Sequence, residues 1–193
     1  MNEDIFNFAN DASFVRLKAK RGGLVSLADF DTIPTFEIPE TYRVNRYTFP
    51  SENYAPHIRD AVEKIAKSAE KKGCNPNFFT ALYEATLNAH QHGNKLDSKK
   101  SVTLVYIIKE DKVRTAIIDE GGQFEADFIP FILNMRLEGS YKKTFHNYYQ
   151  FSNQEKPATN NGTGTSFMHA YVDDVAYLKS KDGGLVVHLT KTF

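Results

Sequence analysis

The sequence has little of what would mark a secreted, membrane-bound or nucleic-acid-binding protein. Its single cysteine, Cys74, excludes a disulfide within the chain. Its 24 basic and 24 acidic residues balance, so no excess of positive charge indicates nucleic acid or a membrane surface. No apolar run is long enough to span a bilayer, and the N-terminus MNEDIFNF lacks the layout of a signal peptide. We expect a cytoplasmic protein with no membrane and no direct nucleic-acid partner.

The chain has 193 residues, 41% of them hydrophobic, which is enough for one domain with a real core. Residues 1–40 combine the basic, glycine-ended stretch KAKRGG with short alternating runs and prolines. We predict an N-terminal extension there, with at most one short strand pair. The remaining residues, 41–193, are predicted to form the domain.

Periodic patterns sharpen from Tyr42 onward. Alternation predicts a strand over residues 42–49, and apolar residues at helical spacing predict a helix that Ser51 caps and Gly73 ends. Asn75 followed by Pro76 predicts the start of a second helix, which runs to Gly93. The further predicted elements are strands at 102–109 and 112–119, a helix at 165–173, and a hairpin of strands 175–181 and 185–190. This order of elements favours an α+β sandwich over a doubly wound sheet.

A long stretch between Gly121 and Gly162 shows no regular pattern. An irregular segment of this length is unusual in a compact domain, and it is more often a functional lid than an accident. We therefore predict a lid at about residues 125–160, with the aromatic cluster FHNYYQF within it.

The segment EATLNAHQHGN places Glu84, Asn88 and His92 four residues apart. On a helix these three side chains fall within roughly 80° of one another, with apolar residues on the opposite side. His90 lies about 160° from His92 by the same arithmetic, so an H-x-H metal pair is not expected. The alternative interpretation is a polar surface stripe on an amphipathic helix.

Two glycine-containing segments follow. In IIDEGGQF, Asp119 ends a strand and could accept from an exocyclic amine, while Gly121 lets the backbone pass close to a flat ring. In NNGTGTSF, Gly162 and Gly164 precede a helix whose free N–H groups and dipole would favour an anion. Each segment alone is equally compatible with an ordinary turn or loop end.

Together and in this order, the three segments resemble the GHKL superfamily of ATP-binding domains, which includes gyrase, a heat-shock chaperone, histidine kinases and MutL. Glu84 to Gly93 looks like its N-box, Asp119-x-Gly121-x-x-Phe124 like its first glycine box, and Gly162-x-Gly164 like its second. The form of the motifs, with YVDDVAY after the second box, is most similar to the anti-sigma factor serine kinases. The resemblance covers about residues 42–193 and implies a Bergerat-type fold. That fold is a two-layer α/β sandwich whose mixed, mostly antiparallel sheet carries helices on one face.

The resemblance implies ATP and Mg²⁺ as cofactors. It makes Asn88 the magnesium ligand and Glu84 the catalytic base that faces the γ-phosphate. Asp119 would read the adenine amine, and Gly121 would let the base lie against the backbone. His92 would either contact a phosphate or fix the end of the helix. The N–H groups that contact the phosphates would come from Gly162, Thr163, Gly164 and Thr165.

The implied activity is transfer of the ATP γ-phosphate to a serine of a STAS-domain anti-sigma antagonist. The partners would be that antagonist and a sigma factor, and the resemblance also allows a homodimer. Residues 1–40 and the long lid, in which Lys142 and Lys143 could close over the nucleotide, depart from the family pattern. Two alternatives follow: an ATP-dependent partner-binding module without phosphotransfer, and an α+β protein without a nucleotide site.

Overall fold

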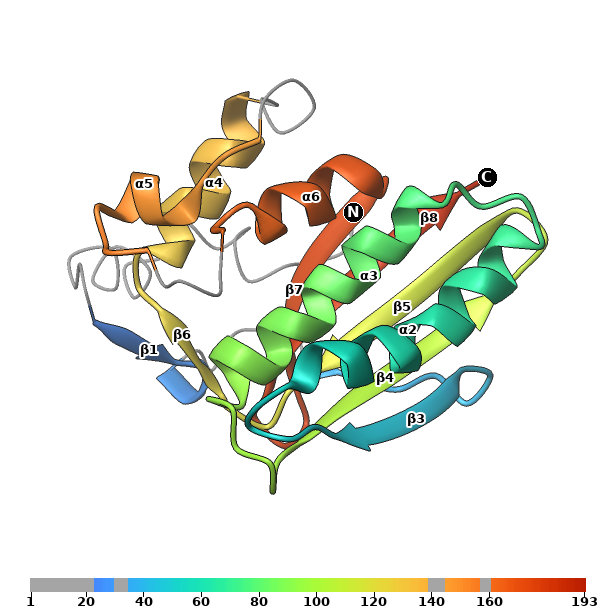
Figure 1. Ribbon diagram of the computed structural model, residues 1–193, viewed down its shortest axis with the longest axis horizontal. Coiled ribbons are helices and arrows are strands. Elements are labelled where there is room, and N and C mark those ends of the chain that lie inside the picture. The colour runs from blue at the N-terminus through green and yellow to red at the C-terminus, as the bar shows by residue number, and fades with distance from the viewer. Residues whose placement is uncertain (1–22, 30–34, 139–144, 157–160) are drawn as a thin grey trace.

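The computed structural model describes residues 23–29, 35–138, 145–156 and 161–193. A six-stranded sheet forms its centre, with strand order β2-β7-β8-β5-β4-β3 (Figure 1). All neighbouring strands are antiparallel except β2 and β7, which are parallel. The strands are β2 Thr35–Phe36, β3 Arg43–Thr48, β4 Ser101–Ile108, β5 Lys112–Ile118, β7 Asp174–Ser180 and β8 Leu185–Thr192.

Three helices lie side by side over one face of this sheet (Figure 1). They are α2 Tyr54–Glu70, α3 Asn77–Asn88 and α6 Gly164–Tyr171. The structure confirms the predicted α+β fold with a mostly antiparallel sheet and helices on one face.

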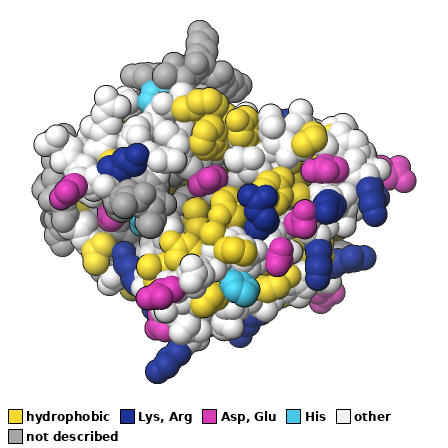
Figure 2. Space-filling model, in the orientation of Figure 1, with side chains coloured by type: hydrophobic (Ala, Val, Ile, Leu, Met, Phe, Trp, Pro, Cys, Tyr) yellow, Lys and Arg dark blue, Asp and Glu magenta, His cyan; other side chains and the backbone are white. Residues whose placement is uncertain are grey.

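The core forms between the helices and the sheet because both present apolar side chains there. In α2 the buried residues Ile58, Val62, Ile65 and Ala69 recur at helical spacing. In the strands every second side chain points to the helices, as in Leu104 of β4. Hydrophobic side chains also gather along α3 on the face in Figure 2. In α3 the rings of Phe79 and Tyr83 stack 6.0 Å apart.

The ends of the helices differ slightly from the sequence prediction. The N-cap of α2 is Asn53 rather than Ser51, and its backbone is left-handed at φ 52°. Asn75 does bond the start of α3, since its Oδ1 accepts from the N–H of Asn77 at 2.9 Å. The α-helical part of α3 ends at Asn88, and the chain continues as a single π-turn, η3 Ala89–Gly93. Among the described residues, no helix has the length and apolar character that crossing a membrane would require.

The prediction of an irregular segment from Gly121 to Gly162 was wrong in part. That segment contains the strand β6 Gln123–Glu125 and the helices α4 Phe128–Glu138 and α5 Tyr148–Ser152. The sequence did not predict α4 for two reasons. Its first turn contains Pro130, although proline is tolerated there, and its sequence FIPFILNM is apolar without helical periodicity. Lys142 and Lys143, the predicted lid cations, lie outside the described residues.

Two short strands fall within the predicted N-terminal extension. β1 Leu24–Ser26 pairs antiparallel with β6, and β2 pairs with β7. The sequence prediction had allowed one strand pair within residues 1–40, but β1 and β2 do not pair with each other. A short 3₁₀ turn, η2 Leu27–Asp29, follows β1, and Leu27 is fully buried in the core.

Candidate functional site

A pocket opens where the end of α3, the end of β5 and the start of α6 meet. Its wall includes Asn88 and His92 from the α3 segment, Asp119 from the β5 end and Gly164 from α6. The two sides of the pocket differ in character. One end is a cradle of closely packed glycine backbone around Asp119, and the other holds the start of α6. The remaining lining residues are Ala89, Gly93, Lys95, Ile117, Gln123, Phe124, Glu125, Phe128, Tyr148, Tyr149, Gly162, Thr165, Met168, Tyr177, Leu185 and Val187.

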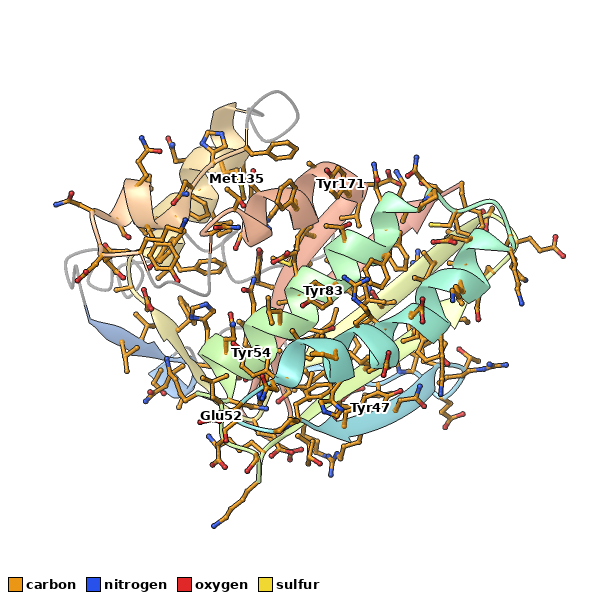
Figure 3. All side chains as sticks on the ribbon, viewed as in Figure 1. Tyr47, Glu52, Tyr54, Tyr83, Met135 and Tyr171 are labelled. Atoms are coloured by element: carbon orange, nitrogen blue, oxygen red, sulfur yellow. The ribbon has the colours of Figure 1, made fainter. Side chains whose placement is uncertain are left out.

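The polar stripe of α3 faces this pocket because the opposite side of the helix is buried. Ala81, Leu82 and Ala85 pack in the core, whereas Asn88 and His92 are half-buried at the pocket wall. A π-turn such as η3 is often found at functional sites. The turn separates the two histidines, since His90 is fully buried with its Nε2 2.9 Å from the carbonyl oxygen of Pro50. His90 also packs edge-on against Tyr54, which Figure 3 labels at the start of α2.

Asp119 is the most buried carboxylate of the pocket, with 3% of its surface exposed. Its Oδ1 accepts from the backbone N–H of Gly121 at 2.9 Å and of Leu185 at 3.1 Å. Burial nevertheless raises the pKa of Asp119 to about 6, because the hydrogen bonds offset only part of the desolvation cost. The two hydrogen bonds from backbone N–H groups fix the direction of the side chain.

Three glycines allow the backbone to close around Asp119. A Cβ on Gly93 would lie 2.2 Å from Asp119 Oδ2, and one on Gly184 would lie 1.7 Å from the Asp119 carbonyl oxygen. A Cβ on Gly121 would lie 1.8 Å from the carbonyl oxygen of Gly93. None of these contacts leaves room for a side chain, so the end of α3, the loop after β5 and the β7–β8 turn meet at one point.

Asn94 joins two of these segments through its side chain. It is fully buried, its Nδ2 donates to the carbonyl oxygen of Ser101 at 2.9 Å, and its Oδ1 accepts from the N–H of Glu120 at 2.8 Å. Glu120 completes the link, because its Oε2 accepts from the N–H of Ser101 at 3.1 Å. The end of α3 is thereby tied to the loop that carries Asp119.

The other end of the pocket is formed by the segment that leads into α6. Gly162 has a left-handed φ of 73°, which favours glycine, and Gly164 is the first residue of α6. Glu84 lies directly against this helix start, since a Cβ on Gly164 would be 2.2 Å from Glu84 Oε2. Burial raises the pKa of Glu84.

The comparisons with known proteins agree with this architecture. The family model of the histidine kinase-like ATPase domain matches residues 51–191, which is more than half of the chain. The chain belongs to this family. A search of curated proteins gave no match. The fold and pocket described above are therefore those of a histidine kinase-like ATPase domain, and the pocket is its candidate ATP site.

In this histidine kinase-like ATPase domain most of the residues singled out from the sequence come together. The pocket wall includes six of them: Asn88, His92, Asp119, Gly162, Gly164 and Thr165. The other three are adjacent to it. Gly121 donates its N–H to Asp119, Thr163 is the N-cap of α6, and Glu84 touches Gly164.

Sequence reasoning missed the part of the pocket wall formed by Glu125, Tyr148 and Tyr149. The hydroxyl of Tyr148 donates to Glu125 Oε2 at 2.6 Å, and Gln154 Nε2 donates to the same oxygen at 3.2 Å. Burial and this carboxylate both raise the pKa of Tyr148, so its hydroxyl keeps its proton. The Tyr148 ring packs against Phe131 of α4 at 5.4 Å. The aromatic cluster FHNYYQF was noted in the sequence without a predicted contact, and nothing local identified Glu125 as the partner.

The Asn88 side chain at the pocket wall offers an amide oxygen, which is a kind of ligand that Mg²⁺ accepts. Among the described residues, no group of three or more His, Cys, Asp or Glu side chains could hold a metal ion. Mg²⁺ keeps several waters and is usually bound through one or two protein oxygens together with substrate phosphates. The Asn88 carboxamide at the pocket wall suits that role.

Proposed function

We propose that this domain is an ATP-dependent protein serine/threonine kinase of the anti-sigma factor type. It would transfer the ATP γ-phosphate to a serine of a STAS-domain anti-sigma antagonist, and it would also bind a sigma factor. A domain that only bound ATP would have no use for a carboxylate beside the phosphates. The position of the Glu84 carboxylate against the start of α6 is therefore the observation that carries this proposal.

Glu84 has the environment of a general base. It is half-buried beside the start of α6, and burial raises its pKa with no hydrogen bond from a described residue to offset the shift. A carboxylate with a raised pKa at a pocket edge is matched to accepting a proton from a hydroxyl. A purely structural glutamate would instead be expected in an ion pair or on a solvated face.

The reaction follows from this placement. The serine oxygen of the acceptor attacks the γ-phosphorus, the bond from that phosphorus to the β–γ bridging oxygen breaks, and ADP leaves. The proton of the serine hydroxyl passes to the Glu84 carboxylate. A positioned base typically contributes about 10²–10⁴-fold to such a step, and the rest depends on alignment and charge neutralisation.

The other pocket residues divide between the two ends of the nucleotide. Asp119 would accept from the adenine amine, and the glycine backbone at Gly121 would pass beside the ring. Asn88 would hold Mg²⁺, which when bound neutralises charge on the phosphates. The N–H groups of Thr163 to Thr165 would face the phosphates at the start of α6. His92, in the pocket wall, would either contact a phosphate or fix the end of the helix.

The second candidate is an ATP-dependent partner-binding module that transfers nothing. The lid favours it, because α5 places two aromatic side chains, Tyr148 and Tyr149, in the pocket wall. The same lid leaves Phe145 and Phe151 about half exposed, at 50% and 43%, which would suit a partner surface that nucleotide binding rearranges.

Incubation with ATP radiolabelled at the γ-phosphate and a panel of STAS-domain proteins separates the two candidates. The kinase proposal expects label on a serine of one acceptor and no label with Glu84→Ala. Tight Mg-ATP binding with no labelled acceptor and no released phosphate would favour the binding module.

A further inference from the structure

The closest approach in the phosphate end of the pocket is between Gly164 and Glu84. A Cβ built on Gly164 would lie 2.2 Å from Glu84 Oε2, 3.1 Å from its Cδ and 3.6 Å from its Cβ. All three of the nearest atoms belong to this one side chain. The carboxylate end of the Glu84 side chain therefore occupies the space that a Gly164 side chain would take.

The backbone conformation of Gly164 does not itself require glycine. Four described glycines have a left-handed φ, and Gly164 is not among them. It is the first residue of α6, a position where alanine would favour the helix. The nearest atoms that a larger residue at this position would meet are those of the Glu84 side chain.

Packing rather than hydrogen bonding directs the Glu84 side chain. α3 and α6 lie against each other along their length, so the contact is set by two rigid elements. Neither the start of α6 nor any other described residue donates a hydrogen bond that fixes the carboxylate, and burial is the one cause that shifts its pKa. The Glu84 carboxylate therefore lies in the space that is free because Gly164 has no side chain.

We propose that Gly164 is a positioning residue for Glu84: the missing side chain holds open the space in which the carboxylate lies. According to this proposal, Gly164 affects catalysis mainly by allowing the position of Glu84, and less by the contact of its own N–H with the phosphates. The inference rests on the proposed function only for what Glu84 does in catalysis. The dependence of one residue on the other is a property of the fold itself.

The test is a double-mutant cycle of wild type, Gly164→Ala, Glu84→Ala and the double variant. In the wild-type background Gly164→Ala is expected to lower the melting temperature, because the added methyl and the Glu84 carboxylate cannot occupy the same space. In the Glu84→Ala background the same substitution is expected to leave the melting temperature unchanged or raise it. An equal decrease in both backgrounds would overturn the proposal.

Activity gives a second, independent readout. In Gly164→Ala, transfer of the γ-phosphate to the serine acceptor is expected to fall by about 10²-fold, as for a displaced catalytic group, and by more than the affinity for Mg-ATP falls. Weaker Mg-ATP binding with unchanged turnover would show that Gly164 serves the phosphates directly, and it would overturn the proposal. A wild-type protein without turnover would refute the kinase proposal but leave the melting cycle valid.

Glu84→Asp with Gly164→Ala covers the case in which Gly164→Ala alone does not fold. The shorter aspartate withdraws from the added methyl, so this double variant is expected to fold and melt close to Glu84→Asp. A double variant that still fails to fold would mean that glycine is required for a reason unrelated to Glu84, and the proposal would be wrong.

Discussion

Replacing Asn94 with alanine tests the link between the end of α3 and the loop that carries Asp119. The substitution removes both side-chain hydrogen bonds of a fully buried residue, at 2.9 Å to the Ser101 carbonyl and 2.8 Å from the Glu120 N–H. Each backbone group left without a partner costs about 1–3 kcal/mol. The expected loss in free energy of unfolding is therefore about 2–6 kcal/mol, a large share of the roughly 5–15 kcal/mol typical of a domain.

Urea unfolding followed by circular dichroism measures this loss directly. A domain of this size loses about 2–4 °C in melting temperature per kcal/mol, so thermal scans should show a decrease of about 4–24 °C. Asn77→Ala is the matched control, because Asn77 is exposed at the start of α3, and it should stay within about 0.5 kcal/mol of wild type. A loss below about 1 kcal/mol for Asn94→Ala would refute the reasoning.

Three further predictions concern the pocket. Calorimetry should find Mg-ATP binding weakened by Asn88→Ala but retained in Glu84→Ala, which loses phosphotransfer by about 10²–10⁴-fold; equal loss of affinity would contradict the division of roles. The folded pKa of Asp119, about 6, exceeds its unfolded value of 3.8, so its proton stabilises the fold below pH 3.8 and that contribution is lost as pH rises through 6. Parallel denaturant titrations should therefore show wild type losing about 3 kcal/mol relative to Asp119→Asn over this range, and a constant difference would refute the shift. Tyr148→Phe removes the hydrogen bond to Glu125, so stopped-flow measurements should find faster ATP release, and an unchanged rate would argue against a lid contact.

Local periodicity was enough to predict the elements that form the two layers. α2, α3 and the strands β4, β5, β7 and β8 each carry a repeating apolar pattern that one buried face imposes. α4 carries no such pattern, because it is apolar around most of its circumference and contains Pro130 in its first turn. The short strands β1 and β2 are too brief to show alternation, and their pairing partners lie far away in the sequence.

Residues of the candidate site could be predicted where they belong to one short sequence motif. They could not be predicted where they depend on contacts between distant parts of the chain. Glu84, Asn88 and Asp119 stand in recognisable motifs, and the fold brings them to one region. Asn94 meets Glu120 across 26 positions, and Tyr148 meets Glu125 across 23. Pairings over such separations follow from the tertiary fold, and neither has a local signal.

A calorimetric titration of Mg-ATP into wild type and into Asp119→Asn tests the central claim most directly. The account predicts one ATP per chain in the wild type and an affinity at least about tenfold weaker in the variant. The asparagine oxygen would stay with the N–H groups of Gly121 and Leu185, so its NH₂ group would replace the oxygen that accepts from the adenine amine. Equal affinity in the two proteins, or no binding to the wild type, would contradict an adenine nucleotide in this pocket.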